Sequence, residues 1–506
     1  MPESSMSNTT RRSGVLCHIT SLATPHGVGD LGPAARGFVD FLIQSGQTLW
    51  QVLPLGPPAH NYSPYSCYSA MAGNRVMISP DDLLVDGLVT EDQVKASAVQ
   101  RADICFVDFQ QSLGKKDVLL RQAFEVFTQT SPCELVDEFE AFQLAQRDWL
   151  EDFARYEAIM SHLVMLDWTQ WPDGLPQHAP DAIAKWDDKL AEEIEYSRFV
   201  QFLFDRQWFK LKSYANERGV QLCGDMPIFV AHESSDVWVN QDLFHLDEVG
   251  KPALVAGVPP DYFSETGQLW GNPLYNWEAI EADEYRWWTQ RFSRAVQQFD
   301  LLRVDHFRGF EAYWEVPASE ETAINGKWVK GPGEKPFRAA EAKLGPLPFI
   351  AEDLGMITEE VYELRDALGY PGMRVLQFGF DNEEDVFHRP IDYPENCVAY
   401  TGTHDNDTVM GWYLRRKSDE TFMELLAPYL ESDLPVNWQL IDAVLQSKAS
   451  LTIMPIQDLF GQGNEARMNV PGKAFGNWAW RFAPETLTPE VAMQMRKLTV
   501  ASSRAV

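Results

Sequence analysis

The stretch LLRVDHFRGF, residues 301–310, joins an apolar run to an arginine and an aspartate two positions apart. Residues two apart in a β-strand lie on the same face, so we expect Arg303 and Asp305 to point in one direction. Charges at a buried strand are costly unless they are paired and used. This stretch alone fits both a structural ion pair and a functional one. The residues in the rest of the chain decide between these two interpretations.

Seven more apolar, β-rich runs share this form, because each of them ends in polar or small residues. Near-continuous apolar runs are typical of parallel strands that are buried on both faces. The seven are GVLCHIT (14–20), TLWQVLPL (48–55), VQLCGDMPI (220–228), PFIAEDL (348–354), MRVLQF (373–378), CVAYTGTHD (397–405) and LTIMPIQD (451–458).

Helical patterns lie between the runs. At 285–300 the apolar residues recur at helical spacing, and at 358–369 Thr358 can cap the start of a helix and Gly369 its end. Alternating strands and helices predict an α/β fold, a (β/α)8 TIM barrel. A doubly wound sheet is the alternative, but it does not explain polar residues at so many strand ends.

The segment between the second and third runs is too long for one crossover. Residues 82–200 are rich in helical patterns, and we interpret them as a helical insertion subdomain within a single catalytic domain, 1–506. One apolar stripe in this segment is more typical of a core than of a ligand platform; it consists of Phe139, Phe142, Trp149, Phe153, Tyr156 and Met160.

The composition limits the class of partner. A formal net charge of −32 speaks against nucleic acid or an anionic membrane as a partner. Residues 1–14 have no apolar stretch typical of a signal peptide, and the chain has no run of about 18 apolar residues that would span a membrane. The six cysteines show no CxxC spacing. We therefore expect a cytoplasmic protein with reduced thiols.

In a barrel of this type the carboxyl ends of the strands build the active site. The polar residues at those ends are Asp225, Arg303, Asp305, Glu352, Asp353, His404 and Asp405. Such a set fits glycoside cleavage by a nucleophile and a proton donor, or a metal site with Asp, Glu and His ligands. A fixed arginine would repel a metal ion, which favours glycoside cleavage.

The residue chemistry suggests separate roles. A guanidinium at Arg303 would hold Asp305 ionised, as a nucleophile requires. Glu352 and Asp353 alternate, so only one of them can face the site; burial would raise the pKa of Glu352 and suit it to be a general acid. Asp405 could bind two sugar hydroxyls and stabilise positive charge on the ring.

The sequence resembles the 4-α-glucanotransferases, also called amylomaltases or disproportionating enzymes, which are relatives of the α-amylases. The resemblance covers nearly the whole chain and rests on SLATPHGVGDLG (21–32), WQVLPLGP (50–57), SPYSCYSAMAGN (63–74), GDMPIFVAHESSDVW (224–238), GVPPDYFSETGQLWGNPLYNW (257–277), RVDHFRGF (303–310), IAEDLG (350–355), GTHDND (402–407) and EARMNVPGKAFGNWAWRF (465–482). It implies an amylase-type barrel with inserted, largely helical subdomains and without a C-terminal β-domain.

The resemblance also implies the site. Asp305 corresponds to the nucleophile, Glu352 to the acid/base and Asp405 to the transition-state stabiliser, with a glucan-binding loop at 250–277 over the active site. The implied sugar contacts are Arg303, His404, Asp225, Ser63, Tyr65, Tyr262, Phe263, Gln268, Trp270, Asn272 and Asn477. It implies no metal and no cofactor. The implied partners are α-1,4-glucans and maltooligosaccharides, with neither nucleic acid nor a membrane, and the protein is expected to be a monomer or a weak homo-oligomer.

The expected reaction is a retaining double displacement in starch, glycogen or maltodextrin metabolism, for which the two carboxyl groups must lie about 5–5.5 Å apart. An α-1,4-glucan hydrolase would use the same carboxylates, and a metal-dependent barrel hydrolase is a further alternative. The loop 257–277 could cover the site and disfavour water, which favours transfer. A glucan-binding protein without activity would be expected to lack one of the three acids, and all three are present.

Overall fold

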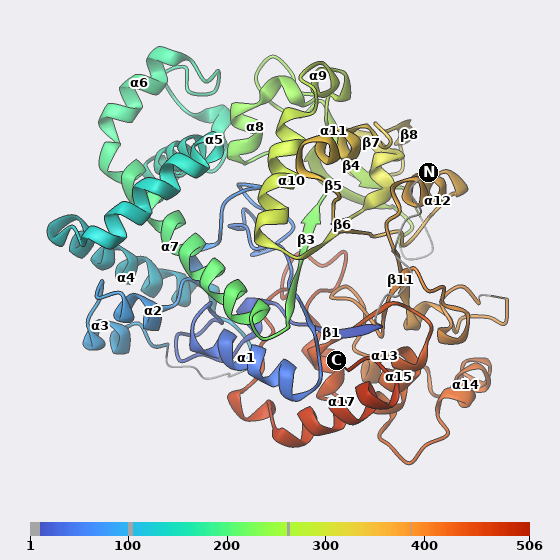
Figure 1. The fold of residues 1–506 in the computed structure, drawn as a ribbon. Helices are drawn as coiled ribbons and strands as arrows, with labels where there is room; N and C mark the ends of the chain where they lie inside the picture. Colours follow the sequence, from blue (N-terminus) through green and yellow to red (C-terminus); the bar gives the residue numbers. More distant parts are fainter. Residues whose placement is uncertain (1–10, 100–104, 261–263, 385, 506) are drawn as a thin grey trace.

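The computed structural model describes residues 11–99, 105–260, 264–384 and 386–505, and its centre is a ring of eight parallel strands (Figure 1). All eight runs predicted from the sequence form these strands. They are β1 (Arg12–Leu16), β2 (Leu49–Gln51), β3 (Gln221–Pro227), β6 (Leu301–Asp305), β9 (Phe349–Ala351), β10 (Gly372–Val375), β11 (Cys397–Tyr400) and β12 (Leu451–Pro455).

The order of the strands around the ring is β10-β11-β12-β1-β2-β3-β6-β9, and every neighbouring pair in this order is parallel. The ring closes between β9 and β10, where the Ala351 N–H donates to the Pro371 carbonyl at 2.9 Å. The (β/α)8 barrel is thereby confirmed, and the doubly wound alternative is wrong because an open sheet would leave β9 and β10 at opposite edges.

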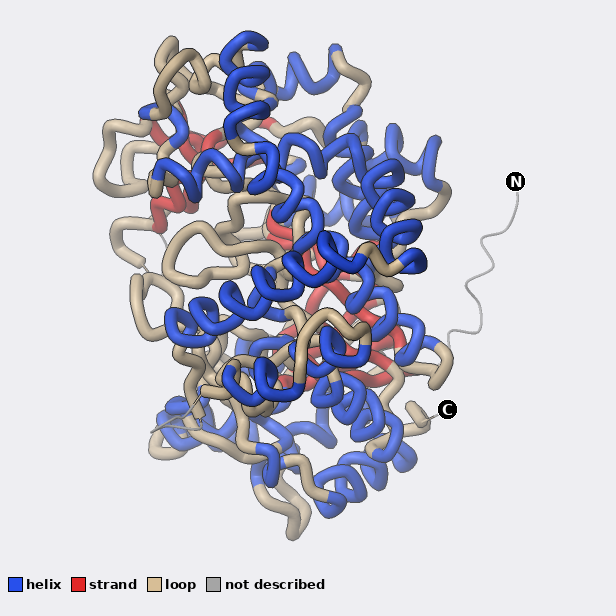
Figure 2. Tube along the Cα trace, turned by 90° about the vertical axis from the view of Figure 1, so that its left-hand side faces the viewer, coloured by secondary structure: helices blue, strands red, loops and turns tan. Residues whose placement is uncertain are grey.

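Helices surround the strands, which are drawn in red inside a blue shell in Figure 2. Two of them match the predicted patterns: α10 (Arg286–Gln298) buries Trp288 and Phe292, and α12 (Glu359–Leu368) begins after Thr358 and ends at Gly369. Gly369 has φ +73°, a conformation that favours glycine. The other helices that follow the strands are α1 (Pro33–Gln44), α11 (Lys335–Leu344), α13 (Val409–Arg416), α14 (Glu420–Leu426), α15 (Val436–Gln446), α16 (Ile456–Leu459) and α17 (Pro489–Ala501).

The long connection from β2 to β3 is helical. It contains α2 (Pro80–Val85), α3 (Glu91–Ala96), α4 (Phe109–Thr130), α5 (Cys133–Leu163), α6 (Pro180–Lys189) and α7 (Ala191–Asn216), whose longest members form one side of the molecule in Figure 1. The predicted aromatic stripe lies on α5, where Phe139, Phe142, Phe153 and Tyr156 are buried and Phe139 contacts Phe199 and Phe202 of α7. The stripe is therefore core.

A second sheet, which the sequence analysis did not predict, stands beside the barrel. It has four antiparallel strands in the order β5-β4-β7-β8: β4 (Leu254–Val258), β5 (Gln268–Pro273), β7 (Ala312–Pro317) and β8 (Lys327–Lys330). The expected loop at 250–277 thus contains two paired strands. The sequence pattern does not indicate these strands clearly, because β5 has three exposed residues in a row and lacks the alternation of apolar and polar residues that is typical of a strand. The short helices α8 (Ser235–Val239) and α9 (Trp277–Ala282) flank this part.

Within the part of the chain that the structure describes, no helix is both long enough and apolar enough to cross a bilayer.

Candidate active site

Neighbouring strands of the barrel bring the predicted charged residues together. In the register of β3 and β6, Asp225 is opposite Arg303 and Pro227 is opposite Asp305. On the other side of β6, the Glu352 N–H donates to the Val304 carbonyl at 3.1 Å. Asp225, Arg303, Asp305 and Glu352 therefore lie side by side at the carboxyl ends of three adjacent strands.

Arg303 is shared by two carboxylates. Its Nη1 donates to both oxygens of Asp225, at 2.8 and 2.6 Å, and its Nη2 donates to Asp305 Oδ1 at 2.8 Å. The side chain of Asp225 is fully buried and that of Arg303 is 5% exposed, whereas Asp305 keeps 27% of its surface accessible. The guanidinium fork thus fixes the orientation of Asp305 while leaving one of its oxygens outside the ion pair.

Glu352 is held by the backbone. Its Oε2 accepts the His306 N–H at 2.7 Å and its Oε1 accepts the Leu354 N–H at 3.0 Å. His306 has φ +52°, a left-handed conformation that costs a residue with a Cβ about 1–2 kcal/mol. The strained turn directly after Asp305 therefore presents an N–H to the neighbouring carboxyl and links the two acids.

Asp353 faces away from the site, as the alternation of the strand predicts. It accepts the Met373 N–H at 2.6 Å and an Arg365 N–H at 2.6 Å, and its side chain is fully buried. Only Glu352 of the adjacent pair is available for chemistry.

The turn after β11 brings the third acid. Asp405 Oδ2 lies 3.3 Å from His404 Nε2, and Asp405 Oδ1 accepts from Asn469 Nδ2 at 2.7 Å. The His404 ring stacks on Tyr65, with centroids 4.9 Å apart, and the Tyr65 hydroxyl donates to Asp225 Oδ2 at 2.7 Å. Asp405 is thus connected through two aromatic side chains to the pair formed by Asp225 and Arg303.

Asp305 and Glu352 retain protons more strongly than isolated carboxyls do, because the pKa of each is raised. Burial raises the pKa of Asp305 to about 8; the carboxylates of Asp225, Glu352 and Asp405 act in the same direction, and Arg303 opposes them. Burial also raises the pKa of Glu352, against the effect of Arg303 and the two backbone N–H groups. Because the two carboxyls share one buried environment, the pair holds a proton more strongly than two isolated carboxyls would, as acid catalysis requires.

The expectation that Arg303 holds Asp305 ionised stays a prediction: Arg303 lowers the pKa of Asp305, whereas burial and the neighbouring carboxylates raise it. Arg303 is a single cation among four carboxyl groups, and two of its N–H contacts go to Asp225. The remaining contact with Asp305 opposes burial and the neighbouring negative charges.

A stability measurement can check this raised pKa. A carboxyl with a pKa of about 8 in the folded state and about 3.9 in the unfolded state favours unfolding as the pH rises between these values. Asp305→Asn removes this effect, so its Tm should exceed that of the wild type by about 1–3 °C at pH 8. The gain should shrink toward pH 5, as calorimetry across this range would show.

Asp148→Asn, at an exposed position, is the matched control and should leave Tm unchanged at both pH values. A Tm of Asp305→Asn that is equal to or below the wild-type value at pH 8 would contradict the raised pKa.

Part of the predicted sugar-binding set lies near the acids. Trp270 of β5 packs edge-on against the His306 ring, with centroids 4.8 Å apart, and its indole N–H donates to Gln268 Oε1 at 3.2 Å. Trp270 is 37% exposed, which leaves an aromatic surface next to the turn that follows β6. Tyr262 and Phe263 lie outside the described residues.

Other predicted contacts are engaged elsewhere. Asn272 donates to the Val230 carbonyl at 2.9 Å, and Asn477 bonds within its own loop to Val470 and Lys473. Ser63 accepts the Tyr65 N–H at 3.3 Å, which shapes the turn that carries Tyr65. The amides of Asn272 and Asn477 thus serve the loops around the site and do not contact the acids.

Two residues that hold Asp405 were not predicted from the sequence. Asn469 contacts its carboxylate, and Arg467 donates to its backbone carbonyl at 2.7 Å. Both lie in the motif at 465–482, about sixty residues downstream. Their polar character within that motif was the only available signal, because contacts between distant loops leave no periodic pattern.

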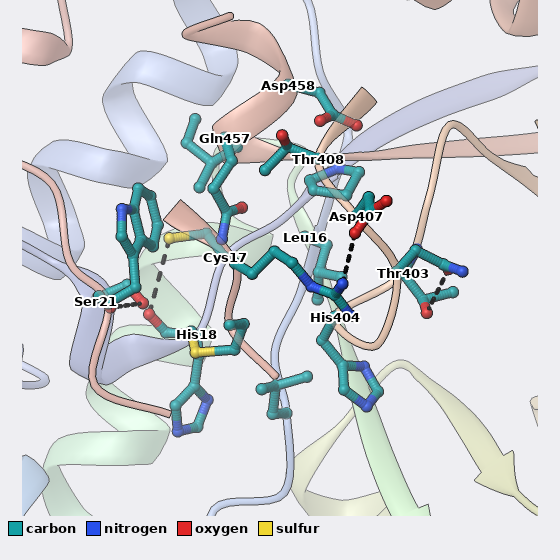
Figure 3. A pocket seen from close by; sticks show the side chains of 17 residues that line it. Leu16, Cys17, His18, Ser21, Thr403, His404, Asp407, Thr408, Gln457 and Asp458 are labelled. Carbon is teal, nitrogen blue, oxygen red and sulfur yellow. Dashed lines mark hydrogen bonds and ion pairs between the residues drawn. The ribbon is translucent and has the colours of Figure 1, made fainter. Parts of the chain in front are cut away.

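Beneath the rim lies a cavity, shown in Figure 3, that is lined by residues of β1, of the turn after β11 and of α16. His404 is one of the residues that line it, and Asp305, outside this lining, keeps 27% of its side-chain surface accessible. In the described part of the chain, no group of three or more His, Cys, Asp or Glu side chains is arranged to hold a metal ion.

Comparisons with known proteins agree with this geometry. A sequence model of the family described as 4-alpha-glucanotransferase matches residues 17–488. The 4-alpha-glucanotransferases of Synechocystis and of Thermus thermophilus are each 44% identical to this chain, over 98% of it and 98% and 99% of their own lengths. The solved amylomaltase of Streptococcus agalactiae in complex with acarbose is 36% identical, with a TM-score of 0.94 over 98% of this chain and 100% of that one.

Proposed function

Since the chain belongs to the 4-alpha-glucanotransferase family, we propose that it transfers α-1,4-glucan segments by a double displacement in which Asp305, Glu352 and Asp405 are the catalytic acids. The observation that carries this assignment is the shared guanidinium of Arg303, which fixes Asp305 beside Glu352 on the adjacent strand. Membership of the family supports the transfer of glucans. The contacts within the site support the roles that we propose for the individual residues.

In the first half of the reaction, a carboxylate oxygen of Asp305 bonds to the anomeric carbon as the glycosidic C–O bond breaks. For this step Asp305 must be the carboxylate and the proton of the pair must be on Glu352, from which it passes to the leaving oxygen, so the shorter glucan departs with a new hydroxyl. Positive charge develops on the sugar ring, and the carboxylate of Asp405, fixed by Asn469, stabilises it.

In the second half, the 4-hydroxyl of another glucan attacks the anomeric carbon and gives its proton to Glu352. The ester bond to Asp305 breaks, and the carboxylate returns to Arg303. Both substrates are α-1,4-glucans or maltooligosaccharides, and Trp270 offers them an exposed ring on which glucose can stack. His404, Tyr65 and Asp225 form the floor beside the reacting carbon.

A product analysis tests the reaction type. Maltotriose should yield glucose together with a ladder of longer maltooligosaccharides, because the covalent intermediate passes to sugar acceptors. The number of reducing ends should stay nearly constant. Chromatography of the products and a reducing-sugar assay on the same samples measure both quantities.

An α-1,4-glucan hydrolase predicts the opposite result, a steady rise in reducing ends without longer products. That outcome would reject transfer and leave the assignment of the three acids standing, since hydrolysis uses the same carboxylates.

A further inference from the structure

The turn that carries His404 and Asp405 is fixed at both of its ends by a single buried side chain. This turn, residues 401–408, leaves β11 after Tyr400 and enters α13 at Val409. Asp458 Oδ2 accepts the hydroxyl of Thr401 at 2.6 Å, and its Oδ1 accepts the Val409 N–H at 2.8 Å. The carboxylate of Asp458 on α16 is therefore hydrogen-bonded both to Thr401, the first residue of the turn, and to Val409, the first residue of the following helix.

Asp458 is placed for this task rather than for an ion pair. It is fully buried, and among the residues that the structure describes its carboxylate is influenced by burial, Thr401 and Val409 and by no basic side chain. Its backbone carbonyl accepts Asn437 Nδ2 at 2.9 Å, which fixes α16 to α15. Because a buried carboxylate without a cation is costly, its two hydrogen bonds to the turn are its main compensation.

Between these fixed ends the turn bonds mostly to itself and to the 464–469 segment. Thr403 bonds to Asn406 Oδ1 through its N–H and its hydroxyl, at 2.8 and 2.9 Å, and Arg467 holds the Asp405 carbonyl. Figure 3 shows the turn residues from Thr408 and Asp407 to His404 along the cavity, with Asp458 beside Thr408. A shift of either end would thus move Asp405 relative to the barrel.

We propose that Asp458 is a positioning residue for glucan transfer, which holds the turn 401–408 so that Asp405 faces the reacting carbon. The inference rests on the role of Asp405 in the proposed function. Asp458 itself is not expected to touch the substrate, because its side chain is fully buried and its two carboxylate oxygens bond to Thr401 and Val409.

The side-chain chemistry predicts which variants keep the hydrogen bonds from position 458 to Thr401 and Val409. Burial raises the pKa of Asp458 to about 6, so it is ionised at pH 7.5 and accepts both bonds. In Asp458→Asn the amide oxygen still accepts from Val409, and the amide N–H₂ donates to the Thr401 hydroxyl, which can rotate and accept. Asp458→Ala loses both bonds, and Thr401→Val loses one while keeping the side-chain shape.

The kinetic test uses the maltotriose reaction at pH 7.5. Asp458→Ala should lower kcat by about 100-fold and Thr401→Val by about 10-fold, since a misplaced group loses rate without losing affinity. KM should stay within about twofold of the wild-type value. Asp458→Asn and Thr401→Ser should each restore kcat to within about threefold of the wild type.

A control separates positioning from general destabilisation. Asp300 also accepts a backbone N–H, from Leu222 at 2.7 Å, but at the amino ends of β3 and β6, away from the acids. Asp300→Ala, which loses this bond, should lower Tm while leaving kcat within about twofold of the wild type. If Asp458→Ala does not fold, the pair Thr401→Val and Thr401→Ser carries the test.

A double-mutant cycle distinguishes this inference from the proposed function. In an Asp405→Asn background, Thr401→Val should cause no further loss of kcat, because the effect is transmitted through Asp405. If Asp405→Asn alone retains normal kcat, the role of Asp405 in the proposed function fails. If Asp405→Asn is impaired, two results would overturn the role of Asp458. One is that Thr401→Val lowers kcat equally in the wild-type and Asp405→Asn backgrounds, and the other is that it leaves kcat unchanged in both; either result shows that Asp458 is not a positioning residue for Asp405.

Discussion

Replacing Asp305 by asparagine should lower the rate of glucan transfer by at least about 10⁴-fold while the protein remains folded. The amide is nearly isosteric with the carboxyl, and its oxygen can still accept the Nη2–H of Arg303. It cannot form the ester with the anomeric carbon. Product formation from maltotriose, followed over hours with purified variant and wild type, measures the loss.

Circular dichroism and the Tm of the same preparation are the controls, because a folded, inactive variant isolates the chemistry. Near-normal transfer by Asp305→Asn would contradict the assignment. Arg303, Asp225 and Asp305 would then form a structural ion-pair cluster at the strand ends, the alternative that the stretch 301–310 leaves open.

Replacing Glu352 by glutamine should separate the two halves of the reaction. Transfer between natural glucans should fall by about 10³-fold, since neither the leaving oxygen nor the acceptor is assisted by a proton transfer. α-Glucosyl fluoride needs little protonation, so it should still react with Asp305. The second half lacks its base, and the covalent intermediate should accumulate.

Mass spectrometry of Glu352→Gln after incubation with this fluoride should therefore show one added glucosyl group on the peptide that contains Asp305. Asp305→Asn treated in the same way is the matched control and should carry none. A glucosyl group on Asp225 or Asp405 instead would show that the roles of these carboxyls are exchanged.

The barrel and its acids were predictable from the sequence because parallel strands leave a strong local signal. Each strand is a short apolar run, and the polar residues that follow it meet at one end of the ring. Asp305 and Glu352 could therefore be placed on one rim from their positions in their own strands. The opposite orientation of Asp353 followed from alternation alone.

Features that depend on contacts between distant segments could not be predicted in this way. The strand β5 has an irregular exposed pattern and is defined by its pairing with β4, and Asn469 contacts Asp405 across sixty-four residues. The pKa of Asp305 depends on how many carboxylates share Arg303, which requires the folded arrangement of four strands. Tyr262 and Phe263 remain predictions from the resemblance.

The closure of the barrel between β9 and β10 determines which of its backbone amides exchange fastest with solvent. Seven neighbouring strand pairs form hydrogen-bonded ladders, whereas between β9 and β10 the backbone bond from Ala351 to Pro371 is joined by the contact of Asp353 with the Met373 N–H. Native-state hydrogen exchange by partial opening is fastest where the fewest bonds must break. The amides of Ala351 and Met373 should therefore exchange before those of β1 and β12, and Asp353 acts as a side-chain substitute for the missing ladder. The acidic neighbour of Glu352 thus bridges the barrel wall at the point where the two strands share the fewest backbone hydrogen bonds.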